Sequence, residues 1–369
     1  MTLYSLLLLF LLSGCSFLPF ESQTIPHFSS RVDPALAPSY QEKVGVLHVH
    51  STYSDGSGSV EEITRVAQAQ GLDFVILTDH NTLEGRRRGK AGWHGKTLLL
   101  IDEEISTAAG HCLALGLPEE AKSRESAAWT VQEVRRQGGL AFIAHPFWRK
   151  KPWDEPEIGG ITGLEIYNGV EDVSDENPLL LALSTLFLGS EPTLGWWLDR
   201  PDQELVLWDR RLARGDRLVG IGAADAHGLK WFGLHLAPYS GFFKLVRNHL
   251  LVKEGPLSEK SVYEAIGQGH LFVAHDWVAD ARGFFFAAVR PGGQVAGILG
   301  DQVKREWGLR LYAYLPSPGE MVLFRDGQPI GRSMGQRGWF EIAGPGVYRL
   351  EATRKGRPWI YSNPIHVIE

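Results

Sequence analysis

The stretch Leu47 to Ser59, LHVHSTYSDGSGS, places two histidines one residue apart, directly after the apolar run Val44–Leu47 and just before an Asp-Gly turn. Residues i and i+2 of a β-strand point to the same face. A strand here therefore predicts that His48 and His50 stand side by side at its end, where two imidazoles can hold one metal ion. The alternative is a pair of surface histidines on an edge strand, and the spacing alone does not exclude it.

From Val44 onward the chain alternates short apolar runs with segments of helical pattern. Ser59 and Glu62 form a capping box that opens a helix ending at Gly71, and Thr130 and Glu133 form a second capping box. Strands separated by helices predict a mostly parallel sheet or a barrel. The segments expected as further strands are LDFVILTDH, TLLLIDEEIS, HCLALGL, LAFIAHP, GLEIYN and RLVGIGAADAH.

The polar residues with catalytic potential fall at one place in each unit, the carboxyl end of the strand. In (β/α) barrels this rim is where active sites are built. Histidines with purely structural roles would not be expected to keep to one end, so the pattern favours a functional site over surface histidines. The residues concerned are His48, His50, His80, Glu104, His145, Asp225 and His227.

Five motifs in a fixed order carry a family resemblance: HVHSTYSDG, TDHN, EEIS followed by GHCLALG, AHPF and DAH. Together they resemble the successive motifs of the PHP (polymerase and histidinol phosphatase) domain, over about residues 44 to 280. The resemblance implies a distorted (β/α)7 barrel that hydrolyses phosphate esters with two or three metal ions. The N-terminal stretch Leu12-Ser13-Gly14-Cys15 resembles a lipobox, the lipid-attachment signal of bacterial lipoproteins. Together with this domain and a C-terminal β-domain, it resembles the arrangement of a group of bacterial PHP lipoproteins.

The resemblance further implies a set of metal ligands at the matching motif positions. A first ion would be held by His48, His50, Glu104 and Asp225, a second by the bridging Glu104 with His111 and His145, and a third by Asp55, His80 and His227. Glu103 competes with Glu104, which is preferred because the family pattern is Glu-Ile-Ser. Mixed imidazole and carboxylate ligands suit Zn, Mn or Fe rather than Ca or Mg.

The expected chemistry is hydrolysis of a small-molecule phosphoester by a hydroxide that bridges two metal ions. Glu104, Asp225 and His227 would act through this hydroxide. Cations for the phosphate are sought in the loops of the same rim, at Arg86, Arg149 and Lys230. Two alternatives stay open: a metal hydrolase for a non-phosphate ester or an amide, and a non-catalytic metal-binding module whose β-domain binds a partner.

The N-terminal segment is expected to be a targeting signal. The apolar run Leu6–Leu12 is too short to span a membrane and fits the core of a signal peptide. Leu12-Ser13-Gly14-Cys15 resembles the lipobox of bacterial lipoproteins, which implies a signal peptide at 1–14, a lipidated Cys15 and a tether over 15–43. The expected location is the cell envelope, on the periplasmic face of the outer membrane. A buried N-terminal helix is the alternative.

Differences in sequence pattern divide the rest of the chain into domains. A barrel domain is expected over 44–282, with an insertion at about 168–215 whose apolar stretch LLLALSTLFLG predicts a buried helix; a substrate lid or a membrane-contacting surface is the alternative. In residues 283–369, apolar and polar residues alternate with a period of two, and Asp326-Gly327 is a signal for a hairpin turn. This segment therefore predicts a small antiparallel β-sandwich. The 37 basic and 43 acidic residues give a net charge of -6, which gives no sign of nucleic-acid binding.

Overall fold

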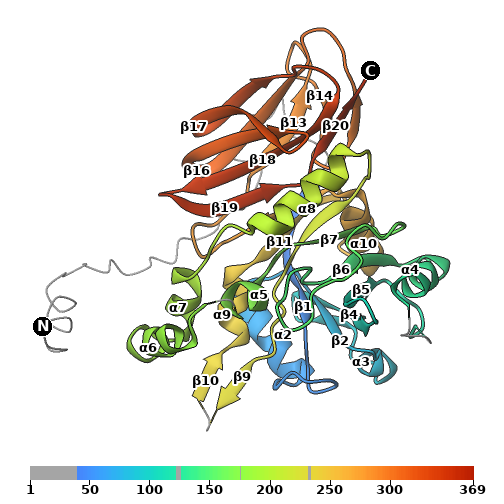
Figure 1. Cartoon of the computed structure of the whole chain (residues 1–369), viewed down its shortest axis with the longest axis vertical. Coiled ribbons are helices and arrows are strands. Elements are labelled where there is room, and N and C mark those ends of the chain that lie inside the picture. The colour runs from blue at the N-terminus through green and yellow to red at the C-terminus, as the bar shows by residue number, and fades with distance from the viewer. Residues whose placement is uncertain (1–39, 122–125, 175, 232–233) are drawn as a thin grey trace, which may run out of the picture.

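The computed structural model describes residues 40–121, 126–174, 176–231 and 234–369, with the side chains of 178, 179, 181, 182, 229–231 and 234–236 outside the description. Cys15 and the expected signal peptide lie outside the described residues. The described chain has a mixed α/β part followed by a sheet of mainly antiparallel strands (Figure 1). This confirms the predicted fold class at the level of its two architectures.

The α/β part is a sheet that curls back on itself. Its strands run parallel from β1 to β2 to β4 and from β6 to β7 to β8, while β5 lies antiparallel between β4 and β6. The chain just past β8 returns to β1 through a bridge between Val49 and Ala226 and a 3.0 Å bond from Ala224 N to Leu47 O. The strands are β1 (Tyr40–Val49), β2 (Phe74–His80), β4 (Thr97–Ser106), β5 (His111–Leu115), β6 (Leu140–Ile143), β7 (Gly163–Asn168) and β8 (Val219–Ala223).

Two helices test the capping predictions. Helix α2 (Val60–Ala69) begins after Ser59, whose side chain accepts from Glu62 N, and the chain leaves it through Gly71 at φ 65°. The predicted start of the helix with Ser59 as its N-cap is confirmed. Helix α4 (Ala127–Arg136) instead begins after Ser126, whose side chain accepts from Trp129 N, so the expected cap Thr130 lies inside the helix. The Thr-x-x-Glu spacing there places two residues on one helical face, which an interior turn does equally well.

The remaining helices and short strands complete the α/β part. Strand β1 begins at Tyr40, so residues 40–43 belong to the sheet, paired with β11, and the expected tether ended too late. The other elements are α3 (Glu84–Arg87), β3 (Gly92–His94), α5 (Gly169–Ser174), α8 (Asp202–Ala213), β9 (Leu229–Trp231), β10 (Leu234–Ala237), α9 (Tyr239–Leu245), β11 (Arg247–Lys253), α10 (Glu259–Gln268) and β12 (Leu271–Ala274).

The C-terminal part is built around the long hairpin of β16 and β17. Its turn residues, Asp326 at φ 50° and Gly327 at φ 78°, are both left-handed, as the favoured two-residue hairpin turn requires. This prediction is confirmed. The strands are β13 (Phe285–Val289), β14 (Val295–Ile298), β15 (Gln302–Lys304), β16 (Arg310–Arg325), β17 (Gln328–Glu341), β18 (Gly346–Arg354), β19 (Arg357–Ser362) and β20 (Ile365–Ile368).

The two parts share backbone pairing and buried side chains. β1, β11, β12 and β19 pair in succession as antiparallel neighbours, so hydrogen bonding continues across the expected boundary at 282 and 283. The Asn363 amide bonds both the N–H and the C=O of Gly220, each at 2.8 Å. Arg349 reaches α8 with two 2.6 Å bonds to Asp209. The C-terminal part therefore supports β8 directly.

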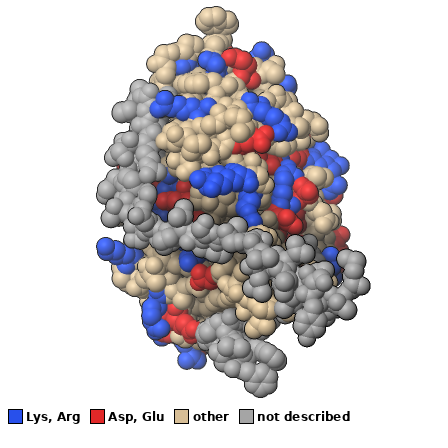
Figure 2. All heavy atoms as spheres, turned by 90° about the vertical axis from the view of Figure 1, so that its left-hand side faces the viewer, with Lys and Arg blue, Asp and Glu red and all other residues tan. Residues whose placement is uncertain are grey.

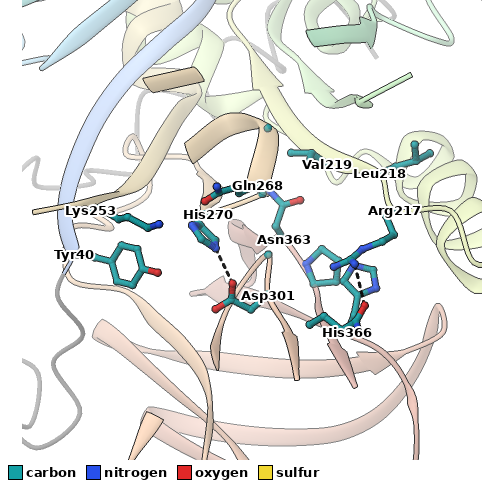
Figure 3. Close-up of a pocket in the computed structure, with 15 residues that line it drawn as sticks. Tyr40, Arg217, Leu218, Val219, Lys253, Gln268, His270, Asp301, Asn363 and His366 are labelled. Atoms are coloured by element: carbon teal, nitrogen blue, oxygen red, sulfur yellow. Dashed lines mark hydrogen bonds and ion pairs between the residues drawn. The ribbon is translucent and has the colours of Figure 1, made fainter. Parts of the chain in front are cut away.

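A cavity of about 460 Å³ lies between the two parts (Figure 3). It opens where β8 begins, at Val219, which is the end of the strand away from Asp225. His270 contacts Asp301 at 2.9 Å within it, and Arg217 and Lys253 line it. None of the predicted metal ligands lines this cavity.

The insertion forms helices α6 (Pro178–Leu188) and α7 (Ser190–Trp196). The prediction of a buried helix is wrong for α6, because its described leucines and its phenylalanine are exposed, Leu186 to 76% and Phe187 to 78%. Helix α7 is partly buried through Thr193 and Leu194. Among the described residues, no helix combines the length and the apolar character that crossing a membrane requires.

Candidate metal centre

The side chains of the rim converge on one buried carboxylate, that of Glu104 in β4. Five imidazole nitrogens approach it, and both of its oxygens are used. Glu103, the competing candidate, points to the other face of β4, where its Oε1 accepts from Ala121 N at 2.7 Å. The distances to Glu104 Oε2 are 3.2 Å from His48 Nε2, 3.3 Å from His50 Nε2 and 3.1 Å from His80 Nδ1; those to Oε1 are 2.9 Å from His111 Nδ1 and 3.0 Å from His145 Nε2.

Two further carboxylates complete the cluster. Asp225 Oδ1 lies 3.5 Å from the Nε2 atoms of both His48 and His50. The half-exposed Asp55 forms an outer group with His50 Nδ1 at 3.5 Å, His227 Nε2 at 3.4 Å and His80 Nε2 at 3.6 Å. The two nitrogens of His50 thus face different carboxylates. The structure therefore brings all nine predicted ligands into one continuous cluster, in which three groups have ligand atoms within 4.8 Å of one another.

The backbone that carries these ligands is not regular strand. The backbone φ angles are 61° at His48, 27° at His145 and 49° at Asp225. Residues other than glycine rarely adopt this left-handed region. β1 ends at Val49 after a register shift, and β8 ends at Ala223, so His50, Asp225 and His227 all lie beyond their strands. The expectation that His48 and His50 share one face of a regular strand is wrong, although their ring centroids still lie 5.1 Å apart. Such strain persists where the surroundings impose it, commonly at functional sites.

A buried carboxylate that the sequence did not reveal organises the cluster from behind. Glu165, in β7, lies 2.6 Å from His48 Nδ1 and accepts from His145 N at 2.7 Å. Asn168, at the end of the same strand, donates to Glu165 Oε2 at 2.8 Å and to Asp225 Oδ2 at 3.1 Å. The available signal was a single Glu within an otherwise apolar strand that ends in Asn. A carboxylate in this position fixes the imidazole tautomer and orients the ring toward the metal.

Asp79 fixes the turn that carries Asp55. Its carboxylate accepts from Ser51 N at 2.8 Å, from Ser51 Oγ at 2.7 Å and from Ser54 Oγ at 2.6 Å. The stretch STYSDG is therefore anchored to the end of β2. This explains how a polar turn at the rim holds a carboxylate in a defined place.

The donor set fits a metal ion. His48 Nε2, His50 Nε2 and His80 Nδ1 are buried and lie 3.1 to 3.3 Å from Glu104 Oε2, but none of them meets it with hydrogen-bond geometry. Buried polar atoms are nearly always satisfied, so such a group of atoms needs an explanation. Imidazole nitrogens and carboxylate oxygens converging at this spacing are the ligands that zinc and similar ions take. The cluster is able to bind metal.

Charge within the cluster is strongly coupled. Burial disfavours the charged form of His50, but the neighbouring Asp225 and Glu104 outweigh it and raise its pKa to about 9. The pKa of His48 is raised as well, by Asp225, Glu165 and Glu104 against burial. Burial acts to raise the pKa of Glu104, yet the facing histidines hold it well below its ordinary value. Without metal, protonated imidazoles and ionised carboxylates therefore stabilise one another.

This coupling predicts that metal binding releases protons. A pKa of about 9 for His50 keeps it protonated at pH 7, and a metal ion must displace that proton, so affinity should rise about tenfold per pH unit for each such imidazole up to pH 9. The free energy of unfolding of the metal-free protein should fall over the same pH range. The raised pKa of His50 stabilises the folded state fully below about pH 6.5, the ordinary histidine pKa, and no longer adds stability above pH 9. Calorimetry in buffers of different ionisation enthalpy and thermal melts measure both effects. A pH-independent affinity between pH 7 and 9 would contradict the coupling.

The structure places the three side chains expected to bind phosphate in different surroundings. Arg86 donates to Ile101 O at 3.1 Å and Leu117 O at 2.6 Å and contacts Glu259, so it is committed to the fold and its prediction is wrong. The side chain of Lys230 lies outside the described residues. Arg149 lines a cavity of about 400 Å³ together with Asn168, whose amide touches Asp225, and is the described candidate near the cluster.

Fold and site together define a class: an α/β protein that gathers imidazoles and carboxylates at one rim, the arrangement of metal-dependent hydrolases. Residues 47–209 match the model of the PHP domain. An uncharacterised protein of Methanocaldococcus jannaschii is 35% identical over 120 residues, which cover 27% of this chain and 66% of that protein.

Two solved structures are also similar. One is a two-domain protein of Bacteroides vulgatus described as containing a predicted PHP-like metal-dependent phosphoesterase, with 15% identity, a TM-score of 0.42 and coverage of 93% of this chain and 100% of that one. The other is an amidohydrolase of Chromobacterium violaceum with bound sulfate and no metal, with 15% identity, a TM-score of 0.33 and coverage of 50% and 87%.

Proposed function

We propose that the protein is a metal-dependent phosphoesterase that binds two or three divalent ions, of Zn, Mn or Fe, in the cluster around Glu104. The convergence of five imidazole nitrogens on this one buried carboxylate is the observation that carries the proposal. When bound, such ions generate a nucleophile from water near neutral pH and neutralise charge on a phosphoryl group. No serine or cysteine nucleophile is then needed.

The residues of the cluster have different roles in the proposed reaction. Glu104 and Asp225 supply negative charge between the histidines, and His227 joins the outer group with Asp55. Glu165 holds the N–H of His48 on Nδ1 and so leaves Nε2 free for an ion. Arg149 would add a positive charge for a substrate phosphate, beside a cavity whose lining also carries Glu171, Asp172, Asp199, Asp202 and Glu204.

A substrate panel tests the proposed function against its alternatives. Protein purified without chelator should hydrolyse nitrophenyl phosphate monoesters or diesters, should lose this activity with a chelator, and should regain it with Zn, Mn or Fe. Nitrophenyl acetate and an amino-acid nitroanilide serve as matched substrates with the same chromophore family. Turnover of only these two would favour the ester or amide hydrolase, and no turnover by fully metallated protein would favour the non-catalytic module.

We also propose that Cys15 is lipidated and anchors the protein to the periplasmic face of the outer membrane. The stretch Leu12-Ser13-Gly14-Cys15 supports this, and so does the burial of Cys112, which leaves Cys15 without a disulfide partner in the chain. Cys15→Ala should abolish processing and lipid attachment, measured by intact mass and by fractionation of membranes. Cys112→Ala is the control that should keep both. An acyl mass shift retained in Cys15→Ala would refute the anchor.

A further inference from the structure

Helix α6 exposes an apolar surface of unusual breadth. Its sequence, PLLLALSTLFL, has no charged residue, and the described large side chains are about half exposed or more. At about 100° per residue these side chains spread over an arc of roughly 200°. A helix on a water-facing surface normally turns such residues inward, and an exposed cluster marks an interaction site. The residues are Leu180, Leu183, Leu186, Phe187 and Leu188.

Helix α7, which packs on α6, ends in an aromatic and cationic pair with Arg357 of β19. Trp196, at the end of α7, is 64% exposed, and the Arg357 guanidinium lies 5.4 Å from the centre of its ring. Arg357 also donates to Gly195 O at 2.7 Å, which holds the pair in place. Tryptophan and arginine beside an apolar surface are typical of the boundary between lipid and water.

Helix α6 is firmly mounted on the α/β part. It packs on α7, and α7 packs on α9 and on β10. Glu191 in α7 accepts from Lys244 Nζ at 2.8 Å and from the hydroxyl of Ser240, both in α9. The apolar surface is therefore a fixed feature of the fold rather than an isolated segment.

The insertion that contains α6 leaves the sheet at the rim that carries the metal ligands. The insertion leaves β7 at Asn168, which bonds Asp225, and β9 begins just after His227. Figure 1 shows α6 on the same side of the molecule as β9 and β10, away from the C-terminal sheet, whereas the end of α7 contacts that sheet through Arg357. A partner or membrane that binds α6 would therefore face the side of the molecule on which this rim lies.

We propose that α6 docks into the acyl boundary of a lipid bilayer and so presents the metal rim to the membrane. Residues 16–39 separate Cys15 from β1 and reach at most about 80 Å when extended, which keeps the body near a membrane that holds Cys15. The helix is about 16 Å long and 10–12 Å wide, so its face covers a few hundred Å², well below the roughly 800 Å² per partner of a stable protein interface. On the described part of the face drawn in Figure 2, acidic and basic side chains are interspersed. A lipid surface fits these observations better than a second copy.

This placement narrows the substrate class, and that step rests on the proposed phosphoesterase function. A rim held at the bilayer surface meets phosphoesters that are themselves anchored there by an apolar chain. The substrate is therefore an amphiphilic phosphoester presented by the membrane rather than a freely diffusing one.

The docking is tested with a fluorescent label that reports its own surroundings. The full lipidated chain carrying Leu186→Cys, labelled with nitrobenzoxadiazole, is reconstituted with phosphatidylcholine vesicles. Cys112 is 1% exposed and its pKa is raised to about 12 by burial, so it should not react. Trp307→Cys is the matched control, because Trp307 is 93% exposed and lies in the C-terminal part.

The label at position 186 should shift to the blue and be quenched by lipids brominated in their acyl chains, whereas the label at 307 should show neither effect. Equal responses at both positions would overturn the docking. In the Cys15→Ser background without vesicles, a shift at 186 that grows with protein concentration would assign the surface to a second copy instead.

The substrate class is tested with Leu186→Gln/Phe187→Gln, which keeps good helix formers in α6, and with Trp307→Gln as control. The double variant should lose about tenfold or more of its turnover of a long-chain phosphoester in vesicles and keep its turnover of the short-chain soluble homologue. Equal loss on both substrates would overturn the substrate class. If the wild type turns over neither, the proposed function fails, while the label still decides the docking.

Discussion

Glu104→Gln is expected to remove most of the bound metal and to lower kcat by about 10³-fold or more, which corresponds to roughly 4 kcal/mol of transition-state stabilisation. The substitution preserves shape but turns one carboxylate oxygen into an NH2 group that cannot ligate a metal. Both oxygens of Glu104 are in use, since five imidazole nitrogens lie 2.9 to 3.3 Å from them. Metal content by mass spectrometry and turnover of a phosphoester measure the effect.

Glu103→Gln is the matched control for this experiment. The neighbouring carboxylate is equally buried, but it accepts from Ala121 N on the other face of β4, a bond that an amide oxygen can also accept. Its variant should keep metal and turnover, with at most a small change in thermal stability. Equal losses in both variants would mean that the strand, rather than the carboxylate of Glu104, was damaged.

The sequence predicted those features that depend on local patterns. Ser59 caps α2, and Asp326-Gly327 turns the β16–β17 hairpin, because cap and turn preferences are set within a few residues. The grouping of the ligands was also predictable. Carboxyl ends of neighbouring parallel strands meet at one edge, so residues as distant in the chain as His48 and Asp225 were expected at one rim.

What the sequence did not reveal depends on contacts between distant residues. Glu165 in β7 supports His48 in β1 across 117 positions, and no local signal connects them. The left-handed backbone at His48 and Asp225 replaces the expected regular pleat, and no local sequence pattern indicates it. Arg86 has the charge that a phosphate needs, but only the fold shows that backbone carbonyls already take its donors.

Hydropathy likewise predicted the wrong environment for α6. An apolar run identifies a helix that avoids water, but it does not say whether protein or another apolar phase receives it. The structure shows Leu186 and Phe187 exposed, while Thr193 and Leu194 of the adjacent α7 are buried against the body. The alternative of a membrane-contacting surface, left open by the sequence, is therefore the one on which the docking proposal builds.

His50→Ala should cost more than Asp55→Ala, because the two residues occupy different places in the cluster. His50 is fully buried and faces Glu104 and Asp225 through Nε2 and Asp55 through Nδ1, so its removal affects both the inner and the outer group. Asp55 is 55% exposed in its side chain and touches only the outer group with His80 and His227. We expect His50→Ala to lose metal from both groups and about 10³-fold in kcat, and Asp55→Ala to lose one ion and about 10- to 100-fold.

Tyr53→Phe, on the same turn, is the control for this pair. Its ring packs against the hydrophobic core and beside the Arg88 guanidinium, so metal content and turnover should both be kept. Circular dichroism must show the same secondary structure in all three variants, since the groups removed lie at strand ends rather than within the core. Titration with metal then distinguishes the inner from the outer group: in Asp55→Ala the tightest site should remain. If His50→Ala retained the wild-type metal stoichiometry and turnover, the cluster would not be the catalytic centre, whatever its geometry.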